Sequence, residues 1–323
     1  MSLLEIRNLS VVLGRHGETV AALNSLDFHM DAGEVVGVVG ESGGGKSTMA
    51  RAVVGILPRN ARVSGQVLFA GSDVLTMDAE SLRHHHGEDV AICFQNPRDA
   101  LSPTRRVGDQ LRDRLKAHRG LSARQADPVA LELLEAVGIR KPKQRLRAYA
   151  HELSGGMCQR VMIALALACS PRMLLADEPT TGLDVTLTRE ILALLRRAAT
   201  EEGALLIISH DLAALAAVCD RIAVLYAGRI VEVGPIDAVI CRPAHPYTRA
   251  LLDAVPDVAG TPTRAIRGSM PTLTVAPVSC SFAARCDRAT PECDASLPPN
   301  VQVEAGHVAA CRYAKEVERG TPA

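Results

Sequence analysis

The residues with the clearest chemical meaning lie at positions 40–47, which read Gly-Glu-Ser-Gly-Gly-Gly-Lys-Ser. This run fits the phosphate-loop pattern G-x-x-x-x-G-K-[ST], with a strand-like run before it and a helix-like run after it. Glycines let the backbone turn sharply and aim its N–H groups at phosphate oxygens. Lys46 would bring a positive charge to the terminal phosphates, and the Ser47 hydroxyl would reach a magnesium ion. The residues expected to contact a nucleotide are Gly40, Ser42, Gly43, Gly45, Lys46, Ser47 and Thr48.

Two adjacent carboxylates end a second apolar run, at residues 173–178. In an open α/β sheet, the end of such a strand is expected to lie beside the phosphate loop. Asp177 suits magnesium coordination, directly or through water, and Glu178 is placed to act as a general base on an attacking water. Together with the loop, these residues predict magnesium-dependent hydrolysis of a nucleoside triphosphate.

The elements that must position these residues alternate between strand and helix, which predicts a mainly parallel sheet covered by helices. Residues 3–13 and 20–30 read instead as two antiparallel strands, and residues 222–233 as a hairpin turned at Ala227-Gly228. Residues 97–150 have helical periodicity and many charges, which predicts a helical subdomain inserted in the core. Further strands are expected at 35–39, 65–70, 89–94, 173–176 and 204–209, and helices at 48–56, 107–118, 123–137, 187–199 and 212–219.

The composition excludes several classes of protein. Of the 323 residues, 47% are apolar, and the 36 basic residues balance the 36 acidic ones. A domain that binds nucleic acid usually has a basic excess, so nucleic acid is not expected as a partner. There is no run of about 18 uncharged apolar residues to span a membrane and no signal peptide, which predicts a cytoplasmic protein.

A further motif, Leu-Ser-Gly-Gly-Met-Cys-Gln-Arg at residues 153–160, precedes an apolar helix-like run. A helix that starts with Ser-Gly-Gly offers a hydroxyl and backbone N–H groups to an anion. With this motif the chain resembles the ABC-type ATPases, whose signature is Leu-Ser-Gly-Gly-x-x-Gln. Gln95 resembles the family's Q-loop, Asp184 in Thr-Gly-Leu-Asp its D-loop, and His210 in Ile-Ser-His-Asp its switch histidine.

The resemblance implies an α/β ABC ATPase core with an antiparallel β subdomain and an inserted helical subdomain at about 97–160. The nucleotide-binding domain would span residues 1–255, and a small, separate cysteine-rich extension would span 256–323. The resemblance also implies that the nucleotide is ATP and that Leu13 stands where the family often stacks adenine on an aromatic residue.

In that family two nucleotide domains pack head to tail, so that the Ser154 loop of one clamps the γ-phosphate held by Lys46 of the other. The resemblance makes Glu178, His210 and Gln95 catalytic residues, with His210 orienting the attacking water. Mg²⁺ would be held by Ser47, Gln95 and Asp177. The implied clamp residues are Ser154, Gly155, Gly156, Gln159 and Asp184.

Three segments resemble the ATP-binding subunits of oligopeptide and dipeptide importers: Phe-Gln-Asn-Pro at 94–97, Tyr-Ala-His-Glu at 149–152 and His-Pro-Tyr-Thr at 245–248. This resemblance implies a related second ATPase subunit, two membrane permeases and an extracytoplasmic solute-binding protein. The chain would then lie peripherally at the cytoplasmic face of the membrane. Two alternatives stay open: import of another solute, such as nickel or a sugar derivative, and a soluble ABC ATPase without a transport role.

Four cysteines gather near the C-terminus: Cys280, Cys286, Cys293 and Cys311. They lack the C-x2-C pairs of common zinc ribbons. The surrounding residues resemble the cysteine-rich extension of the same importers, which favours a [4Fe–4S] cluster over the alternative, a structural Zn²⁺. A third interpretation is four free thiols in a loose tail. Disulfides are disfavoured in a reducing cytoplasm, so cysteines without a metal would stay reduced there.

Overall fold

The computed structural model describes residues 2–15, 18–198, 203–255 and 264–317. The chain divides into two compact units, which are described separately. The first comprises Met1–Met30, Val36–Leu75 and Ser209–Ala323, and the second comprises Asp31–Val35 and Thr76–Ile208. The phosphate loop and the cysteine-rich residues therefore belong to the same unit.

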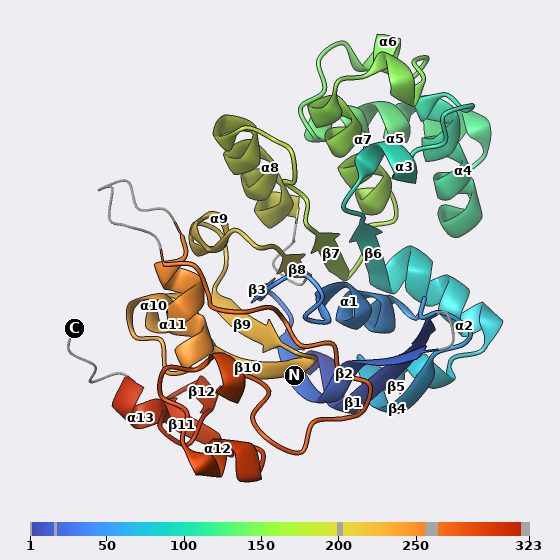
Figure 1. Cartoon of the computed structure of the whole chain (residues 1–323). Helices are drawn as coiled ribbons and strands as arrows, with labels where there is room; N and C mark the ends of the chain where they lie inside the picture. The colour runs from blue at the N-terminus through green and yellow to red at the C-terminus, as the bar shows by residue number, and fades with distance from the viewer. Residues whose placement is uncertain (1, 16–17, 199–202, 256–263, 318–323) are drawn as a thin grey trace. The chain divides into compact units, whose positions relative to one another are not determined.

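An antiparallel sheet of order β2-β1-β4-β5 forms one part of the first unit (Figure 1). Its long strands alternate buried and exposed residues, as a half-buried sheet requires. The two antiparallel strands expected from residues 3–13 and 20–30 are confirmed as the first two. The strands are β1 (Ser2–Arg15), β2 (Glu18–Asp31), β4 (Arg62–Phe69) and β5 (Ser72–Asp73).

The second sheet of this unit has the order β11-β12-β10-β9-β3. Strand β3 (Val35–Val39) is buried throughout and parallel to β9 (Arg221–Tyr226), and it leads to the phosphate loop and α1 (Lys46–Val54). Strand β10 (Arg229–Pro235) forms the predicted hairpin with β9. Ala227 (φ 47°) and Gly228 (φ 78°) both have the positive φ that such a two-residue turn needs. The helices that follow the sheet strands are α9 (Leu212–Ala216), α10 (Ile236–Cys241) and α11 (Pro246–Asp253).

The C-terminal residues extend this sheet, whereas the sequence favoured a small separate tail. Strand β12 (His307–Ala310) pairs antiparallel with β10, and β11 (Asn300–Glu304) pairs with β12 (Figure 1). Without a neighbouring strand, the outer edge of β10 would leave its backbone N–H and C=O groups unpaired. Strand β12 of the C-terminal hairpin pairs with these groups. The short helices of this region are a 3₁₀ turn at Ala283–Arg285, α12 (Pro291–Ala295) and α13 (Ala314–Val317).

A buried carboxylate joins the C-terminal hairpin to the residues before α11. Glu232 accepts hydrogen bonds from the backbone N–H groups of Ala244 (2.7 Å) and His245 (2.8 Å). Its Oε1 also lies 2.7 Å from His307 Nε2, on β12. Because a buried carboxylate is costly unless it is paired, these contacts fix the positions of all three segments.

The second unit contains three parallel strands in the order β8-β7-β6: β8 (Ala204–Ile208), β7 (Met173–Asp177) and β6 (Val90–Cys93). A group of short and medium helices lies in the region where the sequence predicts an inserted helical subdomain, and its last helix extends beyond the expected end at about 160 (Figure 1). Its members are α3 (Pro97–Ala100), α4 (Val107–Arg119), α5 (Ala123–Ala136), α6 (Pro142–Arg145) and α7 (Gly155–Leu167). The unit also holds α8 (Val185–Ala198), α2 (Ala79–His84) and a π-helical turn at His85–Asp89, the last two not expected from the sequence.

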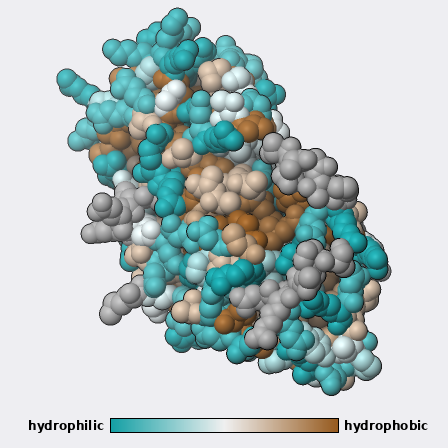
Figure 2. Space-filling model, turned by 90° about the vertical axis from the view of Figure 1, so that its left-hand side faces the viewer, coloured by the Kyte–Doolittle hydropathy of each residue, from teal (hydrophilic) through white to brown (hydrophobic). Residues whose placement is uncertain are grey.

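Within the described ranges, no helix combines the length and the apolar character needed to cross a membrane. Figure 2 shows one face of the molecule, on which hydrophilic residues predominate and hydrophobic residues gather in a central area. The large apolar side chains that are exposed include Phe94 and Val185, 45% and 70% accessible, next to Gln95 and Asp184.

Candidate functional site

The phosphate loop connects β3 to α1 in the conformation that its glycines permit. Gly40, Gly43 and Gly45 have φ values of 152°, 82° and 107°, which disfavour a side chain. A Cβ on Gly40 would lie 2.1 Å from the Leu225 carbonyl oxygen, so the loop passes directly over β9. Ser42, Gly43 and Ser47 are exposed, which leaves the open side of the loop accessible to an anion.

Lys46, the first residue of α1, is 6% exposed and lies against its own loop. Its Nζ donates hydrogen bonds to the carbonyl oxygens of Gly40 (2.7 Å) and Glu41 (3.1 Å). These bonds hold the ammonium group within the loop, where a bound phosphate would meet it. Thr48 is half-buried on the first turn of the same helix.

The β9–β10 turn is hydrogen-bonded to the phosphate loop, a contact that the sequence did not predict. Gly228 N donates to the Gly44 carbonyl (2.9 Å), and Gly228 O accepts from Asn24 N (2.9 Å). The Asn24 amide, 2% exposed, donates to the carbonyl of Ala227 (2.9 Å). The hairpin turn predicted from Ala227-Gly228 therefore has a second role, because it anchors the loop to β2.

Two residues far away in the sequence also hold the loop, and both contact Glu41. The Glu41 N–H donates to the Tyr247 hydroxyl oxygen (2.8 Å), and the Glu41 carboxylate pairs with Arg285 (3.0 Å). Tyr247 belongs to the His-Pro-Tyr-Thr segment and is fully buried, and burial raises the pKa of its hydroxyl well above the usual range. The sequence marked both segments as family features but gave no sign that they meet the phosphate loop.

In the second unit, the ends of β6 and β7 bring two predicted catalytic residues together. Gln95 Nε2 donates to Glu178 Oε2 at 3.2 Å, and Thr181 Oγ1 donates to the same oxygen at 2.9 Å. Glu178 has a left-handed backbone (φ 49°), held by a hydrogen bond of 2.8 Å from its N–H to the Ile208 carbonyl. Asp177, predicted to hold Mg²⁺, precedes it at the half-buried end of β7. The ends of two neighbouring strands therefore bring Gln95 and Glu178 into direct contact, with Asp177 adjacent in the chain.

The signature motif forms the exposed start of α7. Ser154 is the N-cap, and its Oγ accepts from Met157 N at 3.3 Å, so the hydroxyl and the following N–H groups lie at the surface. A Cβ on Gly156 would lie 2.7 Å from the end of the Leu187 side chain of α8, so the start of α7 packs closely against α8. Exposed Asp184 accepts from Leu187 N at 2.9 Å and so caps α8 beside the same contact. The two predicted clamp motifs are thus packed together in one unit.

Two further predicted site residues are Gln159 and His210. Gln159, expected in the clamp, is 2% exposed, and its Nε2 has no hydrogen-bond partner among the described residues. Its side chain is therefore buried, whereas Ser154, Gly155 and Asp184 are exposed. His210 belongs to the first unit, where it is exposed directly after β8 and before α9.

The four C-terminal cysteines are free and half-buried. Burial raises the pKa values of Cys280, Cys286 and Cys311, the last to about 11, and their neighbouring thiols raise them further. Cys280 and Cys293 are also joined through their backbones, by a 2.9 Å hydrogen bond from Cys280 N to the Cys293 carbonyl. Across the part of the chain that the structure describes, no three His, Cys, Asp or Glu side chains are arranged to hold a metal ion. The expected [4Fe–4S] cluster or Zn²⁺ therefore has no preformed site.

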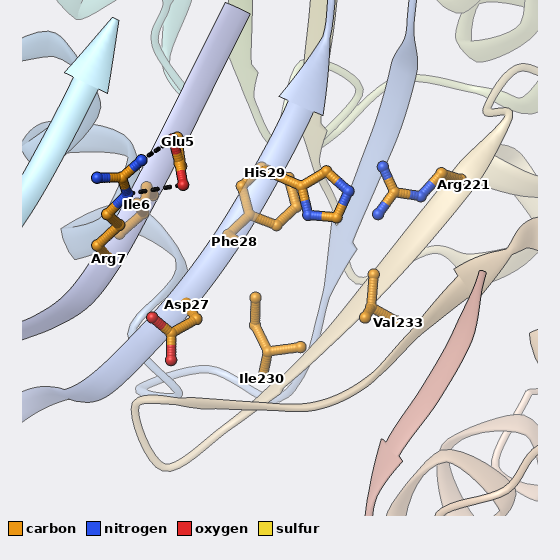
Figure 3. A pocket seen from close by; sticks show the side chains of 9 residues that line it. All are labelled: Glu5, Ile6, Arg7, Asp27, Phe28, His29, Arg221, Ile230 and Val233. Atoms are coloured by element: carbon orange, nitrogen blue, oxygen red, sulfur yellow. Dashed lines mark hydrogen bonds and ion pairs between the residues drawn. The ribbon is translucent and has the colours of Figure 1, made fainter. Parts of the chain in front are cut away.

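A pocket of about 250 Å³ lies elsewhere in the first unit, between side chains of β1, β2, β9 and β10 (Figure 3). Its charges partly cancel, since Glu5 and Arg7 pair with each other at 2.7 Å. The lining residues are Glu5, Ile6, Arg7, Asp27, Phe28, His29, Arg221, Ile230 and Val233. None of the residues predicted from the sequence to bind nucleotide or metal lines this pocket.

Comparisons with known families agree with the two motif sets. The family model described as ABC transporter matches residues 23–181. The model described as Oligopeptide/dipeptide transporter, C-terminal region, matches residues 231–293. The first match contains the phosphate loop and the signature, and the second contains Tyr247 and Arg285, the two side chains that contact Glu41.

Individual relatives are similar over nearly the whole chain. A probable peptide ABC transporter ATP-binding protein, y4tR of Sinorhizobium fredii, is 42% identical over 321 residues, which cover 98% of this chain and 96% of that protein. The oligopeptide transport ATP-binding protein OppD of Salmonella typhimurium is 41% identical over 312 residues, or 96% of this chain and 93% of that protein.

Among solved structures, the ATP-binding cassette MJ0796, a dimer bound to ADP and Pi in a post-hydrolysis state, is similar with a TM-score of 0.65. It is 26% identical and covers 72% of this chain and 98% of its own. Clostridium perfringens cbiO1, part of the ABC transporter complex cbiONQ, has a TM-score of 0.64 at 26% identity, covering 74% of this chain and 91% of its own.

Proposed function

Because the chain belongs to the oligopeptide/dipeptide family of ABC transporter ATP-binding proteins, we propose that its ATPase drives the import of peptides through partner permeases. One observation carries this proposal. The C-terminal region that matches the oligopeptide/dipeptide transporters contains Tyr247 and Arg285, which both contact Glu41 of the phosphate loop, and this contact supports a link between the subfamily's C-terminal region and ATP binding.

We assign the residues of the reaction as follows. Lys46 and the loop N–H groups bind the phosphates of ATP, and the Ser47 hydroxyl, Gln95 and Asp177 hold Mg²⁺. Mg²⁺ supplies charge neutralisation on the phosphate oxygens when bound. Glu178 accepts the proton of the attacking water, and Gln95 orients its carboxylate through the 3.2 Å hydrogen bond. His210 contacts the γ-phosphate and orients that water.

The remaining motif residues act on a second subunit. Ser154, Gly155 and Asp184 are exposed and would clamp the nucleotide held by the partner's phosphate loop, with Gly156 and Gln159 shaping the start of α7. Exposed Phe94 and Val185 add apolar surface next to Gln95 and Asp184. The similar cassette MJ0796 is dimeric, which supports this arrangement. We propose a related ATP-binding subunit as the partner.

The full assembly would comprise the two ATP-binding subunits, two permeases and an extracytoplasmic solute-binding protein, with this chain peripheral at the cytoplasmic face. ATP-driven closure of the subunit pair would be transmitted to the permeases, and hydrolysis would reopen it. The relatives described as peptide transporters favour peptides over the alternative cargoes, nickel and sugar derivatives.

The cargo is tested by reconstituting the chain with its permeases and binding protein in liposomes and measuring uptake of labelled oligopeptides, Ni²⁺ and a sugar. We expect ATP-dependent accumulation of the peptide alone, and a complex with Lys46→Ala serves as the inactive control. Uptake of Ni²⁺ or of the sugar, without uptake of the peptide, would identify that solute as the cargo and contradict the proposal. Failure of the chain to assemble with any permease would favour a soluble ATPase without a transport role.

For the four C-terminal cysteines we propose a metal site that is not preformed. It would form on metal binding, when the metal brings the four thiols together. Their number, their spacing and the 2.9 Å hydrogen bond from Cys280 N to the Cys293 carbonyl support it. Thiolates are the ligands for both iron–sulfur clusters and Zn²⁺, so binding would release protons. Elemental analysis of anaerobically purified protein should show iron or zinc that is lost when the four cysteines become serine. Protein with neither metal would leave four free thiols.

A further inference from the structure

Arg285 lies one residue before Cys286, yet its guanidinium ends at the phosphate loop. Nη1 donates to Glu41 Oε1 (3.0 Å) and Nη2 to Glu41 Oε2 (3.2 Å), which makes a two-point, charge-assisted contact. The Arg285 side chain is 6% exposed and the Glu41 side chain 26%, so water screens the pair only in part. Formation of such a pair costs desolvation free energy. Removal of one partner strongly destabilises the fold, because it leaves the other charge buried and unpaired.

The same loop residue is also held through its backbone. The Glu41 N–H donates to the buried Tyr247 hydroxyl, and the Glu41 carbonyl accepts from Lys46 Nζ at 3.1 Å. Glu41 therefore links Arg285 and Tyr247, from the C-terminal half of the chain, to the lysine that meets the phosphates. The Glu41 backbone is thus hydrogen-bonded to Tyr247 on one side and to Lys46 on the other.

The packing around Arg285 restricts the motion of its side chain and so fixes its contact with Glu41. Its guanidinium lies 5.8 Å from the centre of the Tyr226 ring and 5.9 Å from that of Phe282, and the two rings meet edge to face at 5.3 Å. Arg285 Nε also donates to the Arg267 carbonyl (2.6 Å). The planar guanidinium thus packs against two aromatic rings, and its N–H groups donate to Glu41 and to the Arg267 carbonyl.

The segment that Arg285 holds continues along the loop. Beyond residue 267, the Met270 Cε would lie 3.6 Å from a Cβ on Gly44, and the Leu273 carbonyl accepts from Ala21 N at 2.7 Å. Residues 267–273 therefore run from Arg285 past the phosphate loop to the start of β2. The C-terminal region covers one side of the loop over several contacts.

A loop with glycine at positions 40, 43, 44 and 45 has high conformational entropy unless its neighbours restrict it. We propose that Arg285 is a positioning residue for ATP binding: it holds Glu41, and through Glu41 the phosphate loop and Lys46, in the shape that receives the triphosphate. Preorganisation of this kind raises affinity by removing the entropy cost of ordering the loop on binding.

The proposal is tested in the assembled transporter by measuring KM and kcat for ATP with the variants Arg285→Ala and Glu41→Gln. Either change should raise KM about five- to thirtyfold, because ground-state and transition-state binding are lost alike. The value of kcat should change less than about threefold by the same argument. Arg285→Lys keeps the charge but not the two-point geometry and should lie in between.

A double variant separates positioning from general weakening. If Arg285 acts through Glu41, the KM of Arg285→Ala with Glu41→Gln should be no higher than that of the worse single variant. The matched control is Arg267→Ala, which removes an arginine of the same region whose side chain is 82% exposed and pairs with Asp287 at the surface. Its KM should stay within about twofold of the wild type.

Several outcomes would overturn the proposal. They are an unchanged KM in Arg285→Ala, a fall in kcat at constant KM, fully multiplicative effects in the double variant, or an equal effect in Arg267→Ala. If Arg285→Ala fails to assemble, Glu41→Gln decides alone, since it preserves side-chain size and the backbone bond to Tyr247. An unchanged KM in that variant would then refute the role.

Discussion

Gln95 donates a 3.2 Å hydrogen bond to Glu178, although 83 residues separate them in the chain. The contact follows from strand pairing: Cys93 of β6 is in register with Ala176 of β7, and each of the two residues lies two positions beyond its strand partner. Two parallel strands therefore deliver an amide and a carboxylate to the same sheet edge. The amide restricts the rotation of the carboxylate that we assign as general base.

Replacement of Glu178 by glutamine should separate binding from hydrolysis. Glutamine keeps the size of the side chain but cannot accept a proton from water, so turnover should fall at least about 100-fold while ATP stays bound. Single-turnover hydrolysis and nucleotide retention measure the two effects. Glu190→Gln, on the 56% exposed partner of Arg160 in the same unit, should hydrolyse ATP normally. Wild-type turnover in Glu178→Gln would remove Glu178 from the role of base.

Loss of the loop ammonium should abolish binding or turnover. In Lys46→Ala, the Gly40 and Glu41 carbonyls lose their donor and the phosphates lose a positive charge, so ATP hydrolysis should fall at least about 100-fold. Arg51→Ala, on the exposed face of the same helix, is the control and should be near normal. Near-normal hydrolysis by the Lys46→Ala complex would refute the assignment of the loop.

Two loop glycines should respond differently to alanine. Both have positive φ, but a Cβ on Gly43 would meet nothing within 4 Å, whereas one on Gly40 would lie 2.1 Å from the Leu225 carbonyl. Gly43→Ala should cost about 1–2 kcal/mol of backbone strain, and Gly40→Ala should cost more because the loop must leave β9. Thermal unfolding without nucleotide measures both, and equal melting temperatures would contradict the described path of the loop.

The stability of the first unit should fall in acid through His245. Burial lowers the pKa of this imidazole from 6.5 to about 4, and its Nδ1 accepts the Tyr247 N–H. The unfolded chain takes up a proton near pH 6.5 and the folded one does not. Stability is therefore complete above pH 6.5 and declines as the pH falls toward 4, by about 3 kcal/mol in all.

His245→Asn should remove this part of the pH dependence, because asparagine can still cap α11 but does not titrate. Urea unfolding at several pH values between 4 and 7 gives the difference between variant and wild type. His151→Asn, at an exposed position, should keep the wild-type slope. Equal slopes for wild type and His245→Asn would show that His245 is not the titrating group.

The sequence by itself determined the features that depend on neighbouring residues. The phosphate loop, the Ala227-Gly228 hairpin and the helical subdomain were all predicted, because turn glycines, strand alternation and helical periodicity act over a few positions. The resemblance to the ABC-type ATPases also identified Gln95 and Glu178 as catalytic candidates, which the structure brings into contact. The strands and helices so predicted were confirmed within a few residues, as α4 and β9 illustrate.

Only the tertiary structure decided which distant residues hold the loop. Arg285 lies 244 positions from Glu41, and Tyr247 lies 206 positions from it, and no local pattern encodes either contact. The same is true of Glu232 and of strand β12, which joins β10 where a separate tail was expected. Burial selects such pairings, because a charged or polar group removed from water is stable only beside the partner that the whole fold supplies.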